Sequence, residues 1–467
     1  MFDFTNLYTL TVFFLMVLFL VWRPRGINES IPPTISAILI FLAGIVPLSD
    51  IFRILGIVSG ASITILSTIV MSIILSSIGF FRWAAFNLVN RANGSGVLLF
   101  WYINLLCFLM TMFFNNDGSI LITTPIIIEI VRILKLKQHE QFPYLLSGAL
   151  IATASSAPIA VSNLANLISL KIVGLDLNDY VSMMFVPSMV GIIVISLLLY
   201  YYFHKDIPTK IKLVPISYIE TQLASPSSVH QNLAPPHPPH PPHPPLADKV
   251  NNPIMIDKSM FKVCIAIVTL IRASLFIGAS FGIPLELFGV IGALLLIGYR
   301  WYKKGVGPND LVKQTPWHII LFAFSIYVVV YALHNIGLTE QLVMLLREPI
   351  SANYLNASLF FGGLVTIMSN SFNNLPSVMI GTFTLTSMGL DMPTLQIAYL
   401  ASIIGSDIGS LITPMGTLAS LIWMFLLRKS GITISWGSYI KVTVMVIPIA
   451  LLVSLLSLYI WVDWLFF

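Results

Sequence analysis

Apolar runs long enough to cross a lipid bilayer recur along almost the whole of this 467-residue chain, starting with Leu7–Trp22. A helix needs about 20 apolar residues to span the hydrocarbon core, where its backbone polar groups must be satisfied internally. Hydrophobic residues make up 57% of the chain and charged residues only 9%. Soluble domains carry roughly 25% charged residues. The sequence therefore predicts an all-α polytopic membrane protein.

Charge and cysteine content narrow the class further. The first apolar segment has no basic region before it and no small-residue cleavage site, so we expect it to remain as a span. The net charge of +5 suits an anionic leaflet and indicates no nucleic-acid partner. Cys107 and Cys264 each lie in an apolar segment, so we expect two core hydrophobes and no disulfide framework. The expected location is the plasma or inner membrane, with many passes through the lipid bilayer.

One polar segment, residues 204–258, interrupts the apolar pattern and contains "APPHPPHPPHPPLADK". Its composition predicts a solvated polyproline spacer, which we place in the cytoplasm. Weak metal binding by three histidines at every third residue is the alternative. The linker divides the chain into a first transmembrane repeat, 1–203, and a second, 259–467. The histidines are His237, His240 and His243.

The two halves share sequence at matching positions. "FNNDGSILI" begins at Phe114 and "FNNLPSVMI" at Phe372, 258 residues later, and the same offset relates the Ile-Gly pairs that begin at positions 78 and 336. "SNLANLI" at Ser162 matches "GTLASLI" at Gly416 at an offset of 254. Interrupted apolar segments at matching positions of two halves indicate a transporter binding site.

The spans predict the relation between the halves. Residues 97–134 and 355–390 are expected to be re-entrant hairpins with Asn-Asn tips inside the membrane. Five crossings in each half then give opposite orientations, so the expected fold is two inverted repeats of about five transmembrane helices, each with a re-entrant hairpin and a broken helix. The expected spans are 5–22, 30–48, 57–79, 142–175 and 181–203, then 259–279, 283–299, 317–337, 395–427 and 440–463.

Basic residues suggest which side each loop faces. With the N-terminus outside, most of the 24 Lys and Arg residues fall on or next to the cytoplasmic side, as the positive-inside rule requires. The exceptions are Arg53, Lys171, Arg272 and Arg347.

Polar residues at the hairpin tips and in the broken spans are the expected substrate-binding groups. Non-helical backbone at membrane depth persists only where protein or a water-filled cavity satisfies it. Amides, hydroxyls and helix termini aimed into such a cavity could hold a polar solute. These residues are Asn115, Asn116, Asn373 and Asn374 at the tips, with Ser162, Asn163, Asn166, Thr413 and Thr417 in the broken spans.

Acids inside the apolar segments are the expected proton-coupling groups. Asp117 and Asp407 lie where a charged carboxylate is disfavoured, so each could bind and release protons during transport. Capping a helix at each break is compatible with that role. Glu129 is expected to form an ordinary ion pair with Arg132, three residues later. Arg272 lies well inside its span and could extend toward the membrane surface, with a role in substrate binding as the alternative.

Several other functions fit less well. An aspartyl protease needs two carboxylates close enough to share a proton, and the sequence gives no sign of that. No phosphate-binding G-x-x-x-x-G-K-[ST] loop occurs, so ATP-driven activity would need a separate subunit. A free channel is disfavoured because paired broken helices suit alternating access. We expect a secondary transporter that is not an enzyme and has no cofactor and no metal site.

The motifs "FFNNDGSILITTPI", "APIAVSNLAN", "FNNLPSVMIG", "GSDIGSLITPMGTLASLIW" and "ITISWGSYIK" resemble those of the arsenite efflux carriers, the ArsB family of the ion transporter superfamily. The similarity covers nearly all of the chain outside the linker, and it adds Gly416 to the expected substrate site. It implies export of trivalent arsenic and antimony in exchange for protons, and a soluble ATPase partner for some members. Matching residues include Thr124, Pro125, Pro376, Gly405 and Gly409.

The chain departs from the family pattern at two places. Thr153 stands where the family commonly has Asp, and Ser410-Leu411 where it commonly has Pro-Lys. Loss of one acid and one base is consistent with a deleted ion pair or with a shifted substrate. A sodium/proton exchanger, a sodium-coupled dicarboxylate carrier and the membrane subunit of an ATP-driven arsenite pump stay open as alternatives. Neutral arsenite is a trihydroxide, which suits amides, hydroxyls and carbonyls.

Overall fold

The computed structural model describes residues 4–22, 24, 27–211 and 258–466, and every regular element in those ranges is a helix. Nine segments there are long and apolar enough to cross a membrane, which confirms the prediction of an all-α polytopic membrane protein. These segments contain α1 (Phe4–Trp22), α3 (Leu48–Ser77), α5 (Gly96–Phe113), α9 (Leu177–Phe203), α11 (Lys258–Ser280), α12 (Leu285–Lys304), α14 (His318–Asn335), α18 (Met392–Asp407) and α20 (Trp436–Leu465).

The second and third helices differ from the predicted spans 30–48 and 57–79. α2 (Ile31–Leu42) has only 12 residues, whereas α3 has 30 and begins nine positions earlier than expected. The reason is a turn at Gly44, where φ is +71°, followed by Pro47 as the N-cap of α3. Proline fits just before a helix because its missing N–H needs no partner there.

Each half contains one helical hairpin at the predicted position. α5 packs against α6 (Asn116–Ile133), and α16 (Tyr354–Phe372) packs against α17 (Asn374–Ser387). Only Phe114-Asn115 separates the first pair and only Asn373 the second. Both chain reversals therefore occur at the Asn-Asn tips, while the depth of these tips in the bilayer stays a prediction.

Two helices are interrupted where the polar motifs predicted a break. α7 (Gln138–Ala154) leads through a short 3-10 turn, η2 (Ala160–Ser162), into α8 (Leu164–Val173). In the second half α18 leads through η4 (Gly409–Ile412) into α19 (Leu418–Lys429). Both unwound segments are largely buried, so their backbone groups must find partners inside the protein.

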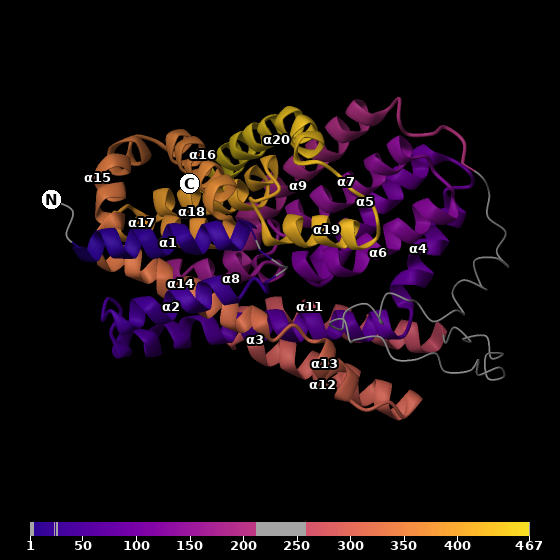
Figure 1. Ribbon diagram of the computed structural model, residues 1–467, viewed down its shortest axis with the longest axis horizontal. Coiled ribbons are helices and arrows are strands. Elements are labelled where there is room, and N and C mark those ends of the chain that lie inside the picture. Colours follow the sequence, from indigo (N-terminus) through magenta and orange to yellow (C-terminus); the bar gives the residue numbers. More distant parts are fainter. Residues whose placement is uncertain (1–3, 23, 25–26, 212–257, 467) are drawn as a thin grey trace.

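Two short helices correspond to the repeated Ile-Gly pairs. α4 (Phe80–Arg91) follows Gly79 and α15 (Leu338–Ser351) follows Gly337, with φ of +84° and +83°. Glycine adopts this left-handed conformation without a steric penalty, which explains the residue at both positions. Figure 1 shows α15 at one end of the long axis and α4 toward the other. α13 (Asn309–Gln314) precedes α14.

Helices of the two halves pack against each other throughout the core. α9 lies beside α20, α12 beside α3, and α14 beside α2. The hairpin helices cross over in the same way, because α6 packs on α19 and α17 on α8. In Figure 1 the yellow α19 accordingly lies next to the purple α6. The buried apolar side chains form one cluster drawn from both halves.

The linker prediction falls almost entirely outside the described residues, since 212–257 are not among them. The division into 1–203, 204–258 and 259–467 therefore stays a prediction, as do the inverted orientation of the halves and the cytoplasmic side. Within the described ranges α9 ends at Phe203 and α11 begins at Lys258.

One predicted ion pair is wrong. Glu129 pairs with Arg82 of α4 at 2.5 Å, and not with Arg132. Arg132 instead donates to the backbone oxygen of Ser430, at the end of α19. The neighbouring helix supplies a closer basic group than the next turn of the same helix does.

Candidate functional site

A small cavity lies where four helices begin. Asn116 of α6, Leu164 of α8, Asn374 of α17 and Leu418 of α19 are each the first residue of their helix, and all four line it. Helix N-termini present unpaired N–H groups and a partial positive charge, which favour oxygen lone pairs. The other lining residues are Asp117, Asn163, Ala165, Ile319, Phe322, Asn373 and Leu375.

The cavity is small in this conformation. Its volume is about 30 Å³, which is close to the share of one water molecule in the liquid. A solute with four heavy atoms, such as a metalloid trihydroxide, would need more room. The hairpin tips or the broken helices must therefore move apart for such a solute to bind.

Three of the four helix starts are capped by predicted substrate-binding residues. Asn115 Oδ1 accepts from the N–H of Gly118 at 3.0 Å, and Asn163 Oδ1 accepts from the N–H of Ala165 at 3.0 Å. Thr417 Oγ1 accepts from the N–H of Ser420, also at 3.0 Å. The capping oxygens are occupied, so these side chains can offer a solute only their remaining groups. One such group is the buried Nδ2 of Asn115, which has no partner within the described ranges.

Asn373 at the second tip is different. Its φ is +78° with ψ of 154°, and its oxygen caps no helix. Its Nδ2 donates to the backbone oxygen of Met415 at 3.2 Å, while its buried Oδ1 has no partner among the described residues. A strained residue with an unsatisfied acceptor at a cavity is a candidate for ligand binding.

Asp117 faces the cavity with a free carboxylate. It is the second residue of α6, is partly exposed, and receives no side-chain hydrogen bond from any described residue. Its neighbour Asn116 instead accepts from the backbone N–H of Asp117 at 2.8 Å. The acid is thus available to a solute or a proton that enters the cavity.

Asp407 has the opposite surroundings. It is fully buried, and its two oxygens accept from Ser156 at 2.7 Å, Asn163 at 2.9 Å, Asn166 at 2.7 Å and Ser406 at 3.2 Å. Three of these donors belong to the first half of the chain. This set of donors suits an ionised carboxylate, which only accepts. Asp407 therefore ties the end of α18 to the first broken helix, and it does not line the cavity.

The remaining predicted residues lie around the unwound segments rather than on the cavity. The Oγ of Ser162 and the Oδ1 of Asn166 are buried and lack partners among the described residues. Thr413 is held by Asn370 of α16, whose Oδ1 accepts from its N–H at 2.8 Å. A β-carbon at Gly416 would lie 1.9 Å from the oxygen of Ser410, so glycine is needed for this close approach.

Two tyrosines that the sequence did not single out hold the unwound segments. Tyr180 donates to the oxygen of Ala157 at 2.6 Å, and Tyr439 donates to the oxygen of Leu411 at 3.1 Å. The two acceptors are related by the offset of 254 that relates the broken spans. A search for tyrosines at a similar offset after each broken span would have found this pair.

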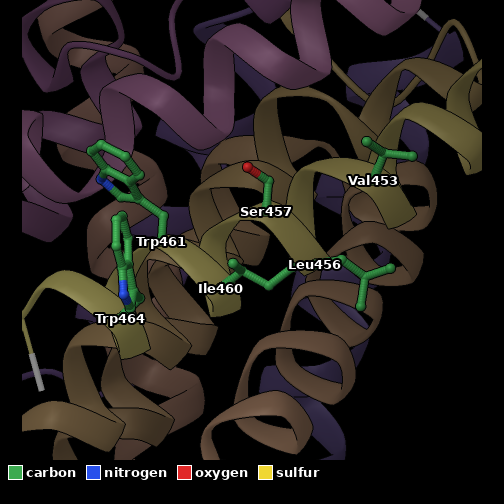
Figure 2. A pocket seen from close by; sticks show the side chains of 6 residues that line it. All are labelled: Val453, Leu456, Ser457, Ile460, Trp461 and Trp464. Atoms are coloured by element: carbon green, nitrogen blue, oxygen red, sulfur yellow. The ribbon is translucent and has the colours of Figure 1, made fainter.

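A larger groove of about 430 Å³ lies on α20 (Figure 2), and we do not assign it to transport. All six lining side chains come from this one helix, and only one aliphatic hydroxyl, on Ser457, is among them. Ile460 and Trp464 are 61% and 78% exposed. An apolar outer face with tryptophans near the helix end is typical of contact with lipid.

Neither cysteine lies at the cavity. Both are buried, one in each half, and neither forms a disulfide within the described residues. The part of the chain that the structure describes contains no cluster of His, Cys, Asp and Glu that could hold a metal ion. A thiolate site for a soft metalloid is therefore not assembled from these residues.

Comparison with known proteins gives matches along nearly the whole chain. The family model for the arsenical pump membrane protein, ArsB, matches residues 8–222 and 246–462. A Bacillus subtilis (strain 168) protein whose name assigns it provisionally to the arsenical pump membrane proteins is 48% identical over 454 residues, covering 97% of this chain and 99% of its own. An arsenical pump membrane protein of Escherichia coli is 30% identical over 448 residues, covering 96% and 97%.

Proposed function

The chain belongs to the arsenical pump membrane protein family, and from that premise we propose that it exports trivalent arsenic and antimony in exchange for protons. The substrate would be the neutral trihydroxide, and transport would proceed by alternating access. The chain would act as a secondary transporter of the cell membrane and would need neither a cofactor nor its own nucleotide site.

The convergence of four helix N-termini on one cavity carries this proposal. A neutral hydroxide offers oxygen lone pairs to backbone N–H groups and hydroxyl protons to acceptors such as Asn373 Oδ1. The amides of Asn116 and Asn374 would supply further donors and acceptors on the cavity wall, and Asn115 lies directly before them in the first tip. A soft thiolate site is not required for a solute bound through its hydroxyls.

Proton coupling is assigned first to Asp117. Its carboxylate is the one acid on the cavity wall and has no donor among the described side chains, so a proton can bind there without displacing a hydrogen bond. Protonation of Asp407 would place a new donor among four existing donors. Asp407 would take part only when the broken helices separate and free one of its oxygens.

Exchange requires that proton and substrate weaken each other's binding at the cavity. A proton on Asp117 converts one acceptor oxygen into a donor and removes a charge, which changes what the cavity offers to a trihydroxide. If both could bind equally well together, they would move in the same direction. Competition is supported by the position of Asp117 on the cavity wall, where the same carboxylate oxygens would accept either a proton or a hydroxyl of the substrate.

The alternatives differ in their driving force. A sodium/proton exchanger could also use Asp117 and Asp407. A dicarboxylate carrier is disfavoured by an acid on the cavity wall, since like charges repel. A soluble ATPase partner would make uptake into vesicles depend on added ATP and on that partner.

The test is uptake of arsenite and antimonite into everted membrane vesicles, with an imposed pH gradient, a sodium gradient or ATP supplied separately. We expect uptake driven by an acid interior and unaffected by sodium. Vesicles containing Asn374→Leu, which removes a cavity amide, serve as the matched control and should accumulate far less. Uptake that follows sodium or ATP alone would contradict proton exchange, and absence of metalloid uptake would contradict the substrate.

A further inference from the structure

Arg272 on α11 is held against the first hairpin instead of extending to the membrane surface, so that prediction is wrong. Its side chain is only 7% exposed. Nε donates to the backbone oxygen of Phe113 at 2.6 Å, and Nη2 donates to the backbone oxygen of Phe114. Nη1 is buried without a partner among the described residues. The acceptors are backbone carbonyls, and no acid among the described residues pairs with this guanidinium.

The two carbonyls lie at the end of α5, where a helix leaves its last carbonyls unpaired. A cation there also complements the negative end of the helix dipole. Phe114 is followed directly by Asn115, which caps α6, and Asp117 is two residues further on. By fixing the peptide units of Phe113 and Phe114, Arg272 fixes the turn from which Asp117 projects into the cavity.

The second tip is held in a different way. Phe372 lies against the rings of Phe13 and Phe14 of α1, with centroids 5.5 and 6.0 Å away. The 258-residue offset relates three pairs of positions, namely Phe114 with Phe372, Arg272 with Phe14, and Asp117 with Leu375. Where the tip carries an acid, the supporting helix carries a base; where the tip carries leucine, the supporting helix carries phenylalanine.

Support of the tip alone does not require the charge. A buried guanidinium without a carboxylate partner is costly, whereas aromatic packing at the corresponding place holds the second tip without that cost. The basic side chain, contributed by α11 of the second half, thus supports only the tip that carries the acid.

We propose that Arg272 is a positioning residue for Asp117, which acts through the backbone of the first hairpin to set the orientation and protonation of that acid. This inference rests on the proposed function for its transport readout, but its structural readout is independent of the substrate.

The structural experiment measures labelling of cysteines at the two tips. In a background lacking Cys107 and Cys264, Ser119→Cys and Ser377→Cys report on the first and second tips, since both serines are fully buried. Arg272→Gln should increase the labelling rate at position 119 and leave position 377 unchanged. Equal labelling at position 119 with and without Arg272 would overturn the positioning role, whatever the vesicles transport.

The transport experiment is a double-mutant cycle with Asp117→Glu and Arg272→Gln, read as pH-gradient-driven metalloid uptake at several pH values. Asp117→Glu keeps a titratable group, so uptake should be reduced but still measurable. Arg272→Gln should reduce uptake by about tenfold or more and shift its pH profile. Arg272→Lys, which keeps the charge, should restore part of the uptake. Adding Arg272→Gln to Asp117→Glu should cause a smaller loss than Arg272→Gln causes in the wild-type protein, because the two residues act as one unit.

Matched variants separate this role from a general structural one. Lys262→Gln removes an exposed charge from the same helix and should leave the pH profile unchanged. Asp117→Leu with Arg272→Phe copies the second tip and should reach the membrane in normal amounts. Two results would overturn the proposal. One is a double variant whose loss of uptake equals the product of the two single losses, and the other is an unshifted pH profile in Arg272→Gln. Failure of the wild-type protein to respond to pH would instead overturn the proposed function.

Discussion

At the scale of single residues, the two acids in the apolar segments have opposite surroundings. Asp407 is surrounded by donors and joins the halves, whereas Asp117 faces a cavity with no donor from a described side chain. The sequence placed both in the same class, because each is an acid in an apolar segment. The difference arises from hydrogen bonds between residues more than 240 positions apart in the chain. A local sequence pattern does not reveal such contacts.

Asp117→Asn should abolish proton-driven efflux while leaving substrate affinity within about tenfold, or roughly 1.4 kcal/mol. The amide keeps the volume and hydrogen-bonding capacity of the acid but does not titrate. Metalloid binding to purified protein and pH-gradient-driven uptake should be measured together. Undiminished uptake with an unchanged pH dependence would reject Asp117 as the proton carrier.

Asp407→Asn should lower stability as well as transport. The new NH2 group would replace one carboxylate oxygen and would face the Nδ2 donor of either Asn163 or Asn166. An unsatisfied buried polar group costs about 1–3 kcal/mol. Thermal unfolding in detergent should show the loss, with Asp391→Asn as control because asparagine caps a helix as well as aspartate does. A variant as stable as the wild-type protein would show that the four donors do not depend on the charge.

At the scale of elements, the close contact of α16 with α18 depends on glycine. A β-carbon at Gly405 would lie 2.3 Å from the oxygen of Gly362, so the helices cannot keep this distance with any larger residue. This contact supports the end of α18, where Asp407 lies. Any movement of α16 relative to α18 during transport would therefore have to disrupt a tightly packed interface.

Gly405→Ala should destabilise the protein by about 1–3 kcal/mol, the usual cost of overpacking. Gly363→Ala is the matched control, because a β-carbon there meets no atom within 4 Å. It should be neutral or slightly stabilising, since alanine favours helix more than glycine does. Similar unfolding temperatures for the two variants would show that α16 and α18 can separate at little cost.

At the scale of the whole molecule, the linker is the part we expect to be dispensable. Deleting residues 226–247 should leave transport largely intact, because a Pro- and His-rich spacer composition offers no apolar core to lose. Uptake per amount of protein in the membrane is the measurement. Loss of uptake at normal membrane abundance would mean that the segment has a direct function.

The fold was largely predictable because apolar runs and helix breakers are local signals. The offset of the FNN motifs located both hairpin tips, and the Ser/Asn/Gly motifs located both broken helices. The site was harder to predict, because the residues that line the cavity are determined by how helices from distant parts of the sequence pack against one another. Thr413 is held by Asn370 on α16, and Glu129 found its partner on α4 instead of one turn ahead. Tyr180 and Tyr439 were missed because tyrosine in an apolar segment usually signals packing alone.

The hydrogen bonds that join Asp407 to Ser156, Asn163 and Asn166 have a consequence for assembly. Neither half can satisfy these groups by itself, so each fragment of a chain cut between them would expose an incomplete polar surface to lipid. Two separately synthesised fragments, 1–225 and 248–467, should then recognise each other and reconstitute transport in the same cell. Asp407 of the second fragment would therefore make association specific, because only a first fragment that carries the amides of Asn163 and Asn166 satisfies its oxygens.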